Sequence, residues 1–405
     1  MSRSAQILWR DRSKLTGPGG EFPGDRAGFG DGLMEVIGDV GEGARAAVRQ
    51  TGETRSSGAA LTWNPASFYE TGNLRPTLWF TVTFIAYLAC IGGVGFASSI
   101  LFKLLLAIPL SFLAGRLFMI GHDACHGSFA RKRIVSGMIG RLALTASFHV
   151  FAAWRYWHNV VHHGSTNNLD KDFVWRPLSK SEYDDAGPLR RALERLFRHH
   201  SGAGFGIYYL LWILLPKMLC VSRAGRRLPG ATPYRDLTLF YVFQAALIAW
   251  LAAAAFLLTE QPSALTIGAN LLFGMIGPTL YVCYALGFVV YFNHTHPSIA
   301  WFRGKAPGSF DERQTEHTLY LKFRGLSAWL LPSEIMGHVV HHLDPRIPVH
   351  RLQEAQARLG AVSPTPVKID LWSWKTQRTI MKTCKLYDPQ QQRWTGFDGR
   401  AADRL

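Results

Sequence analysis

The chain has 405 residues, of which 48% are hydrophobic, 13% aromatic and 18% charged, and its net charge is +16. Soluble domains usually carry about 25% charged residues, so this composition excludes a disordered chain and a coiled coil and indicates apolar segments of membrane length. The five cysteines stand at scattered positions, which excludes a disulfide scaffold and predicts free thiols in a reducing compartment.

Residues 1–75 are rich in glycine, serine and charged residues. They predict a mobile cytoplasmic tail, in which residues 33–50 could form a short helix.

Four segments then reach the ~20 apolar residues that a helix needs to cross a bilayer. They run about 78–97, 100–120, 237–258 and 267–292. Lys103 and Arg116 lie near the two ends of the second segment, where long cationic side chains can extend to the membrane surface. A shorter apolar run, about 205–221, contains Pro216 and Lys217 and is interpreted as an interfacial or re-entrant helix.

The connections between the segments predict their orientation. The first two segments are joined without charge, and the joint 259–264 carries one Glu and no Lys or Arg, whereas residues 131–235 hold 17 Lys and Arg. Because Lys and Arg concentrate in cytoplasmic loops, this stretch and both termini are expected in the cytoplasm. The same charge could bind nucleic acid, but no nucleic-acid fold signature accompanies it, so no such partner is expected.

Histidines gather in four clusters, which the predicted topology places at the cytoplasmic membrane surface. The motifs are GHDACHG, WHNVVHH, NHTHP and GHVVHH, and their histidines are His122 and His126; His158, His162 and His163; His294 and His296; and His338, His341 and His342. Residues four apart on a helix lie one turn apart on the same face. His122 and His126 can therefore lie on one side of a helix.

This arrangement predicts a metal site. Imidazole binds zinc, copper, iron and nickel, whereas a single structural zinc needs four ligands and usually recruits cysteine, and only Cys125 lies near the clusters. Eight or nine histidines could not pack together as cations. Neutral imidazoles around two metal ions with open positions are expected, which predicts redox or hydrolytic chemistry. A single pair of histidines four residues apart is more often a pair of surface residues, but three such clusters on one face of the membrane are not explained in that way.

The histidine motifs resemble those of the integral-membrane fatty acid desaturases, whose superfamily also holds hydroxylases, carotenoid ketolases and alkane monooxygenases. Four segments look like the corresponding segments of acyl-lipid Δ12 and ω3 desaturases of bacteria and plastids. They are GHDACHGSF, WRYWHNVVHHGSTNNLDKDFVWRP, NHTHPSIAWF and HVVHHLDPRIPVHRL. The resemblance covers roughly residues 76–385 and implies a desaturase domain over 76–360 and a cytoplasmic tail over 361–405. One departure is that three residues, rather than the frequent two, separate His158 from the pair that follows.

The resemblance implies an all-α integral membrane protein of a bacterial inner membrane, with four transmembrane helices and a cytoplasmic helical cap that holds a His-rich di-metal site. It implies a fatty acyl (acyl-lipid) desaturase in which two irons bind and reduce O2 and hydrogen atoms leave adjacent methylenes, giving a cis double bond. The implied ligands are His122, His126, His158, His162, His163, His294, His338, His341 and His342.

The choice between His294 and His296 as the ninth ligand depends on the helix. Two residues apart, their side chains point about 200° from each other, so one site cannot easily receive both. Family members that resemble NHTHP keep a histidine directly before the threonine, which favours His294. His296 is then expected to be a hydrogen-bond partner or an interfacial residue.

Further polar residues beside the motifs are interpreted as acceptors for the outward imidazole N–H groups, or alternatively as ordinary capping or solvated residues. They are Asp123, Asn167, Asn168, Asp170, Asp172 and Asp344. The remaining histidines are interpreted as surface or structural residues: His149, His199, His200, His317 and His350. The aromatic residues before the second motif are interpreted as interfacial anchors: Trp154, Tyr156 and Trp157.

The electrons are expected from an external donor, because the sequence shows no cytochrome b5-like HPGG and no cysteine array for an iron–sulfur cluster. A ferredoxin-type donor is favoured over cytochrome b5, since such donors are usually acidic and residues 187–235 are basic. The alternatives are a hydroxylase or ketolase acting on a lipid or carotenoid, and a membrane metal-binding protein without turnover. The sequence leaves double-bond position, chain length, headgroup and oligomeric state open.

Overall fold

The computed structural model describes residues 63–219, 232–258, 263–304, 308–325, 327–328, 334–363 and 366–401. The predicted short helix over residues 33–50, and most of the predicted N-terminal tail, lie outside these residues.

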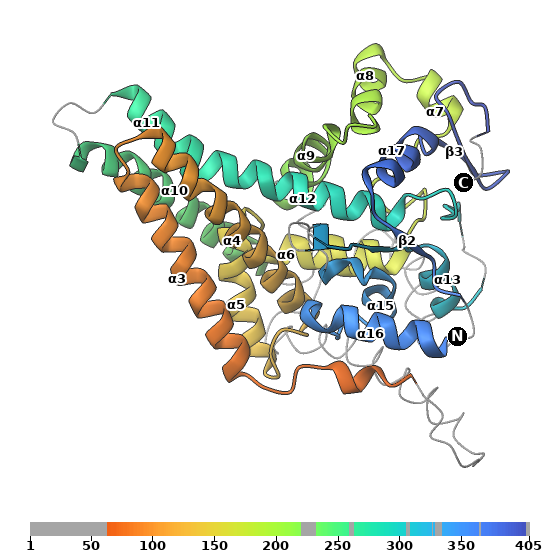
Figure 1. Cartoon of the computed structure of the whole chain (residues 1–405), viewed down its shortest axis with the longest axis horizontal. Coiled ribbons are helices and arrows are strands. Elements are labelled where there is room, and N and C mark those ends of the chain that lie inside the picture. The colour runs from red at the N-terminus through yellow and green to blue at the C-terminus, as the bar shows by residue number, and fades with distance from the viewer. Residues whose placement is uncertain are drawn as a thin grey trace, which may run out of the picture.

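Four long apolar helices confirm the four predicted spans (Figure 1). They are α3 (Leu74–Phe96), α4 (Ile100–His126), α10 (Thr232–Leu258) and a continuous helix over Ala264–His294, composed of α11 (Ala264–Leu271), the π-helical turn η7 (Leu272–Ile276) and α12 (Gly277–His294). In a bilayer the backbone polar groups must be satisfied within the segment, which makes a helix the stable form of each apolar run. The second and fourth spans extend further than predicted, so that His126 and His294 are their last residues.

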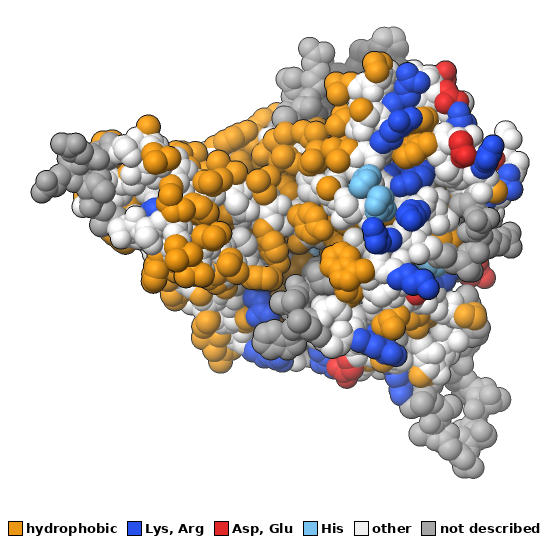
Figure 2. All heavy atoms as spheres, turned by 45° about the horizontal axis from the view of Figure 1, so that its top comes forward, with side chains coloured by type: hydrophobic (Ala, Val, Ile, Leu, Met, Phe, Trp, Pro, Cys, Tyr) orange, Lys and Arg blue, Asp and Glu red, His pale blue; other side chains and the backbone are white. Residues whose placement is uncertain are grey.

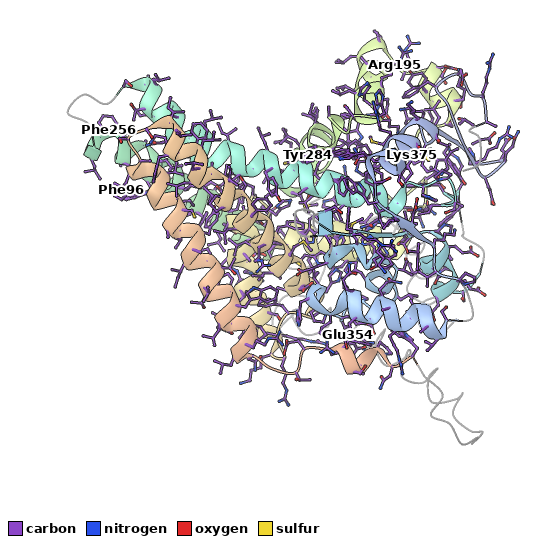
Figure 3. The ribbon with its side chains drawn as sticks, viewed as in Figure 1. Phe96, Arg195, Phe256, Tyr284, Glu354 and Lys375 are labelled. Atoms are coloured by element: carbon purple, nitrogen blue, oxygen red, sulfur yellow. The ribbon has the colours of Figure 1, made fainter. Side chains whose placement is uncertain are left out.

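The surface of the molecule separates into an apolar and a charged part. Figure 2 shows hydrophobic side chains over one half of the face drawn and Lys and Arg over the other. In Figure 3, Phe96 and Phe256 lie at one end of the molecule, and Arg195 and Lys375 lie at the other. Both phenylalanines are exposed, as expected of helices whose outer faces contact lipid.

Lys103 does not extend outward from its span, so that part of the prediction was wrong. Its side chain is buried, and its ammonium group donates to the Val94 carbonyl at 2.9 Å and to Asn270 Oδ1 at 2.5 Å. These bonds satisfy a cation inside the helix bundle and connect three of the spans. The Asn270 amide in turn donates to the Leu251 carbonyl.

Two helical segments between the second and third spans shape the interior of the cap. The helix α5 (Arg133–Ala146) and the helical stretch Phe151–Ser165 meet at a bend of 103°; the stretch comprises α6 (Phe151–Trp154), the π-helical η3 (Arg155–His162) and η4 (His163–Ser165). The predicted interfacial run forms one helix over Gly204–Leu219, made of α9 (Gly204–Tyr208) and the π-helical η5 (Tyr209–Leu219), which is too short to count as a span. Its place relative to a membrane stays a prediction.

Close backbone approaches hold these helices together. A Cβ added at Gly121 on α4 would lie 2.5 Å from the Leu144 side chain on α5. A Cβ added at Gly287 on α12 would lie 2.2 Å from the Phe205 carbonyl on α9. Both positions therefore require glycine, and the first sets the packing one residue before His122.

The remaining elements form a cap at one end of the spans (Figure 1). The helical ones are η2 (Pro65–Phe68), α7 (Lys180–Asp184), α8 (Pro188–Phe197), α13 (Phe310–Glu316), η8 (Glu334–Met336), α15 (His338–Leu343), α16 (Val349–Val362) and α17 (Trp374–Thr383). Strand β1 (Tyr320–Lys322) pairs in parallel with β2 (Ile369–Leu371), and β3 (Leu386–Asp388) pairs antiparallel with β4 (Arg393–Thr395).

Residues 366–401, which the sequence analysis assigned to a C-terminal tail, fold against the cap. Trp394 is buried and its indole donates to the Ile299 carbonyl at 3.0 Å. The buried Arg198 guanidinium donates to the Cys384 carbonyl at 3.2 Å. These contacts attach the segment to the end of the fourth span and to α8.

Candidate metal centre

The first histidine motif occupies the last turn of α4. Gly127, at φ 71°, ends the helix directly after His126 in a left-handed conformation that glycine adopts without strain. His122 and His126 are four residues apart, and their rings lie 4.8 Å apart between centroids. The span itself therefore presents both imidazoles at its end, as the spacing predicted.

The second motif lies on the π-helical segment η3. The N–H of His163 donates to the His158 carbonyl, five residues back, in place of the usual four. This wider turn accommodates the three residues between His158 and the following pair. The rings of His158 and His162 stack with centroids 5.5 Å apart, yet the two residues belong to different groups of histidines.

The third motif and the NHTHP segment complete the set. On α15, His338 and His342 are one turn apart, and His341 points to another side of the helix. His294, the last residue of α12, places its Nε2 2.9 Å from Nε2 of His338.

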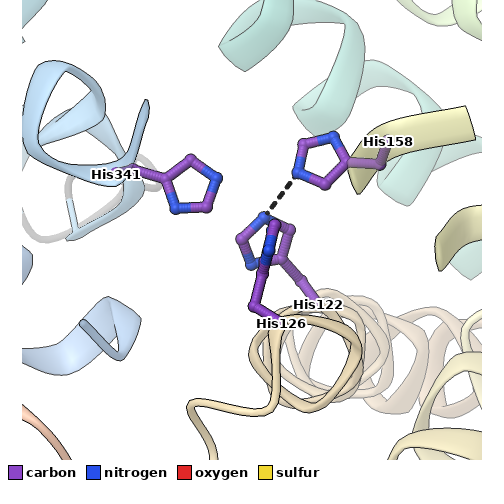
Figure 4. Close-up of side chains that lie close together, drawn as sticks. All are labelled: His122, His126, His158 and His341. Atoms are coloured by element: carbon purple, nitrogen blue, oxygen red, sulfur yellow. Dashed lines mark hydrogen bonds between the residues drawn. The ribbon is translucent and has the colours of Figure 1, made fainter. Parts of the chain in front are cut away.

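The histidines converge into two groups of four. In each group every residue offers a ring nitrogen within 4.8 Å of the others, and the groups are His122, His126, His158 and His341 (group A), and His162, His294, His338 and His342 (group B). Figure 4 shows group A, in which Nε2 of His122 and Nε2 of His158 are 3.0 Å apart. Three elements distant in the sequence thus supply group A: α4, η3 and α15.

His163 lies between the two groups. Its Nε2 is 3.2 Å from Nε2 of His158 in group A, and its ring stacks on His342 of group B with centroids 4.3 Å apart. All nine predicted ligands are therefore together, and His163 adjoins both groups.

Polar side chains hold the outward nitrogen of several rings. Asp123 Oδ1 lies 3.2 Å from Nδ1 of His122, and Asp172 Oδ2 lies 3.0 Å from Nδ1 of His162. Asn167 Oδ1 lies 3.1 Å from Nδ1 of His294. Because a carboxylate or amide oxygen only accepts, Nδ1 of these rings carries the proton and Nε2 keeps a free lone pair directed into the site.

Three other predicted partners lie elsewhere, and one of them, Asn168, donates to the Gly304 carbonyl at 2.7 Å. Asp170 accepts hydrogen bonds from Arg303 and from the Gly304 N–H. Asp344 accepts from Tyr69 and Arg346. These carboxylates point away from the imidazoles because cationic or phenolic donors engage them instead.

His296 lies outside both groups. Its Nδ1 contacts the Ser298 hydroxyl at 2.6 Å, and its Nε2 lies 3.4 Å from Asp370. This position agrees with the expectation that His294, and not His296, joins the histidine set.

Sequence reasoning missed two partners of His342. Gln314 Oε1 lies 3.0 Å from Nδ1 of His342, and the Thr166 hydroxyl lies 3.2 Å from the same atom. Gln314 sits on α13, 28 residues before His342, and carries no local signal. Thr166 follows the second motif by only three residues and could have been considered.

The donor set fits two metal ions. Nε2 of His126 and both ring nitrogens of His341 are buried and find no hydrogen-bond partner among the residues that the structure describes. Burial and neighbouring imidazoles lower the pKa of His338, His341 and His342 well below its usual range. Buried neutral nitrogen atoms without partners are costly, and a metal ion would satisfy them.

Comparison with known proteins identifies the family. The sequence profile of the fatty acid desaturase family matches residues 95–369, about two thirds of the chain. The matched region contains every histidine of groups A and B. The chain belongs to the fatty acid desaturase family. The predicted resemblance is thereby confirmed.

Individual relatives in the family are distant. The chain is 26% identical over 332 residues to an sn-1 oleoyl-lipid 12-desaturase of Picosynechococcus, an alignment of 80% of this chain and 88% of the relative. It is 25% identical over 280 residues to the chloroplastic omega-6 fatty acid desaturase of Glycine max, covering 68% of this chain. It is 24% identical over 288 residues to an sn-1 acyl-lipid omega-3 desaturase (ferredoxin) of Nostoc, covering 64% of this chain and 69% of the relative. The chain spans 60% of the length of the Glycine max relative.

One aromatic residue of this desaturase-family chain departs from its prediction. Trp154 is 5% exposed, and its indole stacks on the His158 ring with centroids 4.7 Å apart. The interpretation as an interfacial anchor was therefore wrong for Trp154, because the sequence does not reveal which side of α6 faces the core. His149 and His317 are buried, and His199 is exposed.

A polar pocket of about 430 Å³ adjoins group B. Asp172, the partner of His162, lies in its wall, and four cationic side chains line it: Lys171, Arg176, Arg190 and Lys217. The Arg190 guanidinium lies over the Trp212 ring at 4.2 Å. The pocket brings a basic surface of this desaturase-family chain close to one of its two histidine groups.

Proposed function

We propose that this protein is an acyl-lipid desaturase, which inserts a cis double bond into an acyl chain of a membrane lipid with O2 and external electrons. The observation that carries the proposal is the convergence of two groups of four histidines, seven of the eight buried, at the end of four apolar spans. An acyl chain lies within the bilayer, so a site at this end of the spans can receive it from the membrane.

In the proposed enzyme, groups A and B, with His163 between them, hold two iron ions. Bound iron would supply the O2 activation and one-electron chemistry that removal of hydrogen from an unactivated methylene requires. All-nitrogen neutral ligands distinguish this site from the carboxylate-rich di-iron sites of helical bundles.

The chain's own residues would prepare the ligands. Asp123, Asp172 and Asn167 fix the Nδ1–H tautomer of three imidazoles, so each presents Nε2 without rotation. His338, His341 and His342 are each at most 3% exposed. The packed helices thereby exclude water from the site, which protects reactive states from side reactions.

We also propose that the electron donor is of the ferredoxin type. Support comes from the four cationic side chains of the pocket beside Asp172, because opposite charge guides an acidic donor to a basic surface. The Nostoc relative carries ferredoxin in its name. Reconstitution with purified ferredoxin and with cytochrome b5, each with its reductase, tests this: turnover with cytochrome b5 alone would contradict it.

The orientation proposed is that of a bacterial inner-membrane protein with the histidine site and both termini in the cytoplasm. The 17 Lys and Arg of residues 131–235 support it, since positively charged loops stay on the cytoplasmic side.

The decisive experiment is a lipid profile. The gene is expressed in a host whose acyl chains are saturated or monounsaturated, and the acyl chains and carotenoids are compared with those of the same host carrying His162→Ala. New double bonds that depend on the intact protein are expected. Oxygenated carotenoids or hydroxylated acyl chains would show the alternative chemistry, and an unchanged profile with fully loaded metal would contradict any turnover.

A further inference from the structure

A buried histidine–tyrosine pair lies near group A but outside it. His149 and Tyr209 are both completely buried. Nδ1 of His149 lies 2.7 Å from the Ser147 carbonyl oxygen, and Nε2 lies 2.8 Å from the Tyr209 hydroxyl. A carbonyl oxygen only accepts, so Nδ1 carries the proton and Nε2 accepts from the phenol. The Tyr209 hydroxyl therefore faces a base that is placed to receive its proton.

Trp154 connects this pair with the metal centre. Its indole contacts the His149 ring edge-on, with centroids 5.6 Å apart, and stacks on the His158 ring at 4.7 Å and 25° between the planes. Phe118 packs at 4.8 Å against both His149 and Trp154. Continuous ring contacts thus run from a histidine of group A to His149, whose bond to Tyr209 completes the chain.

Trp154 and Tyr209, the two oxidisable rings in this series of contacts, differ in whether a base lies beside them. Nε1 of Trp154 is buried and has no hydrogen-bond partner among the described residues, so an oxidised indole has no nearby base to take its proton. Tyr209 has such a base in His149. A phenol that loses an electron becomes strongly acidic, and transfer of its proton to an adjacent imidazole stabilises the product. An oxidising equivalent that enters this series of ring contacts is therefore most stable on Tyr209.

We propose that Trp154, His149 and Tyr209 form a protective relay, which supplies one electron to the metal centre when O2 has been activated without an acyl chain in place. The inference rests on the proposed function, because that reaction supplies the oxidant. One electron passes from Tyr209 through Trp154 to the oxidised metal centre. The O–H bond of Tyr209 breaks, and its proton forms an N–H bond at Nε2 of His149.

The products of this step are a neutral tyrosyl radical, a metal centre reduced by one electron, and an imidazolium whose Nδ1–H stays bonded to the Ser147 carbonyl. The relay resets when the external one-electron donor of the reaction reduces the radical and His149 returns the proton. Without the relay, the oxidised centre would attack its own ligands.

The test uses full-length protein loaded with iron, reduced chemically, mixed with O2 in the absence of lipid substrate and frozen rapidly. Electron paramagnetic resonance should detect a tyrosyl radical, whose spectrum narrows when tyrosine is ring-deuterated. Tyr209→Phe should abolish the signal at unchanged iron content. Trp154→Phe should also lose most of it, because the phenyl ring that replaces indole is much harder to oxidise.

The matched control is Tyr208→Phe. Tyr208 is the neighbouring buried residue, and its hydroxyl donates to the Phe173 carbonyl, which cannot take a proton. This variant should keep the radical. A signal of equal yield in Tyr209→Phe, or no radical in the iron-loaded wild type, would overturn the relay.

A second readout separates the relay from the proposed function. With limiting lipid, Tyr209→Phe should start at the wild-type rate and then complete fewer turnovers before inactivation. The radical measurement needs no lipid, so a radical without any lipid product would retain the relay and refute the desaturase proposal. Lipid desaturation without any radical would refute the relay and retain the desaturase proposal.

Discussion

The phenol of Tyr69 donates a 2.5 Å hydrogen bond to the carboxylate of Asp344, 275 residues later in the chain. Asp344 directly follows the helix that carries the third histidine motif. Arg346 bonds the same carboxylate at 2.8 Å, and its guanidinium lies over the Tyr69 ring at 4.7 Å. The segment before the first span thereby supports one wall of the histidine site.

Tyr69→Phe should destabilise the cap by roughly 1.5–3 kcal/mol, the usual contribution of a hydrogen bond to a charged group. Burial and the adjacent Asp344 carboxylate raise the pKa of Tyr69, so the phenol is the donor at neutral pH. Thermal unfolding in detergent and iron retention measure the effect. Tyr241→Phe, which alters an exposed residue, is the control, and an equal effect of both variants would refute the role of the Asp344 bond.

Asp172→Asn should lower iron affinity about 10–100-fold, as expected when the hydrogen-bond partner of a ligating histidine is changed. The Asp172 carboxylate accepts from Nδ1 of His162 at 3.0 Å and from the Asn167 N–H at 2.9 Å. An amide in its place turns an N–H group toward these donors. Competition with an iron chelator measures the affinity. Asp170→Asn should leave it unchanged, because Asp170 bonds Arg303 at the surface.

His294→Ala should abolish desaturation and lower the iron content, whereas His296→Ala should retain substantial activity. His294 is buried with its Nε2 2.9 Å from His338, and His296 bonds Ser298 outside both groups. Metal analysis and lipid profiles of the two variants decide between them. Full iron and activity in His294→Ala would remove this residue from the ligand set.

Acid should destabilise the protein partly through His317. Burial lowers the pKa of His317 from 6.5 to about 4, so the folded state favours the neutral ring. The unfolded state then binds more protons between these values, and stability is lost as pH falls from 6.5 towards 4, by roughly 3 kcal/mol for this residue. Unfolding measured across this range should depend less steeply on pH in His317→Gln. An unchanged slope would contradict the assignment.

Cysteine labelling should report the proposed orientation. In a cysteine-free background, Ala264→Cys lies at the start of the fourth span and Ser181→Cys lies in the cap, and both sites are exposed. An impermeant maleimide should label position 264 in intact cells and position 181 only after permeabilisation. The opposite pattern would invert the topology and place the histidine site outside.

Sequence alone predicted the four spans, and it named histidines that the fold brings together. An apolar run of membrane length must be helical, because a bilayer offers the backbone no other hydrogen-bond partners, and the structure contains those four helices. Local geometry predicts only that His294 and His296, two residues apart on a helix, do not both face one site, and the preference for His294 came from the family resemblance.

Tertiary structure decided how the histidines divide between the groups. His341 joins group A while its neighbour His342 joins group B, and this depends on how α15 packs against α4 and α12. His158 joins group A and His162 joins group B, although both lie on η3. Gln314 reaches His342 from another helix, and Trp154 turns inward onto His158. Such contacts join residues that no short spacing relates, because the direction of a side chain in a packed core is set by the elements around it and not by its own segment.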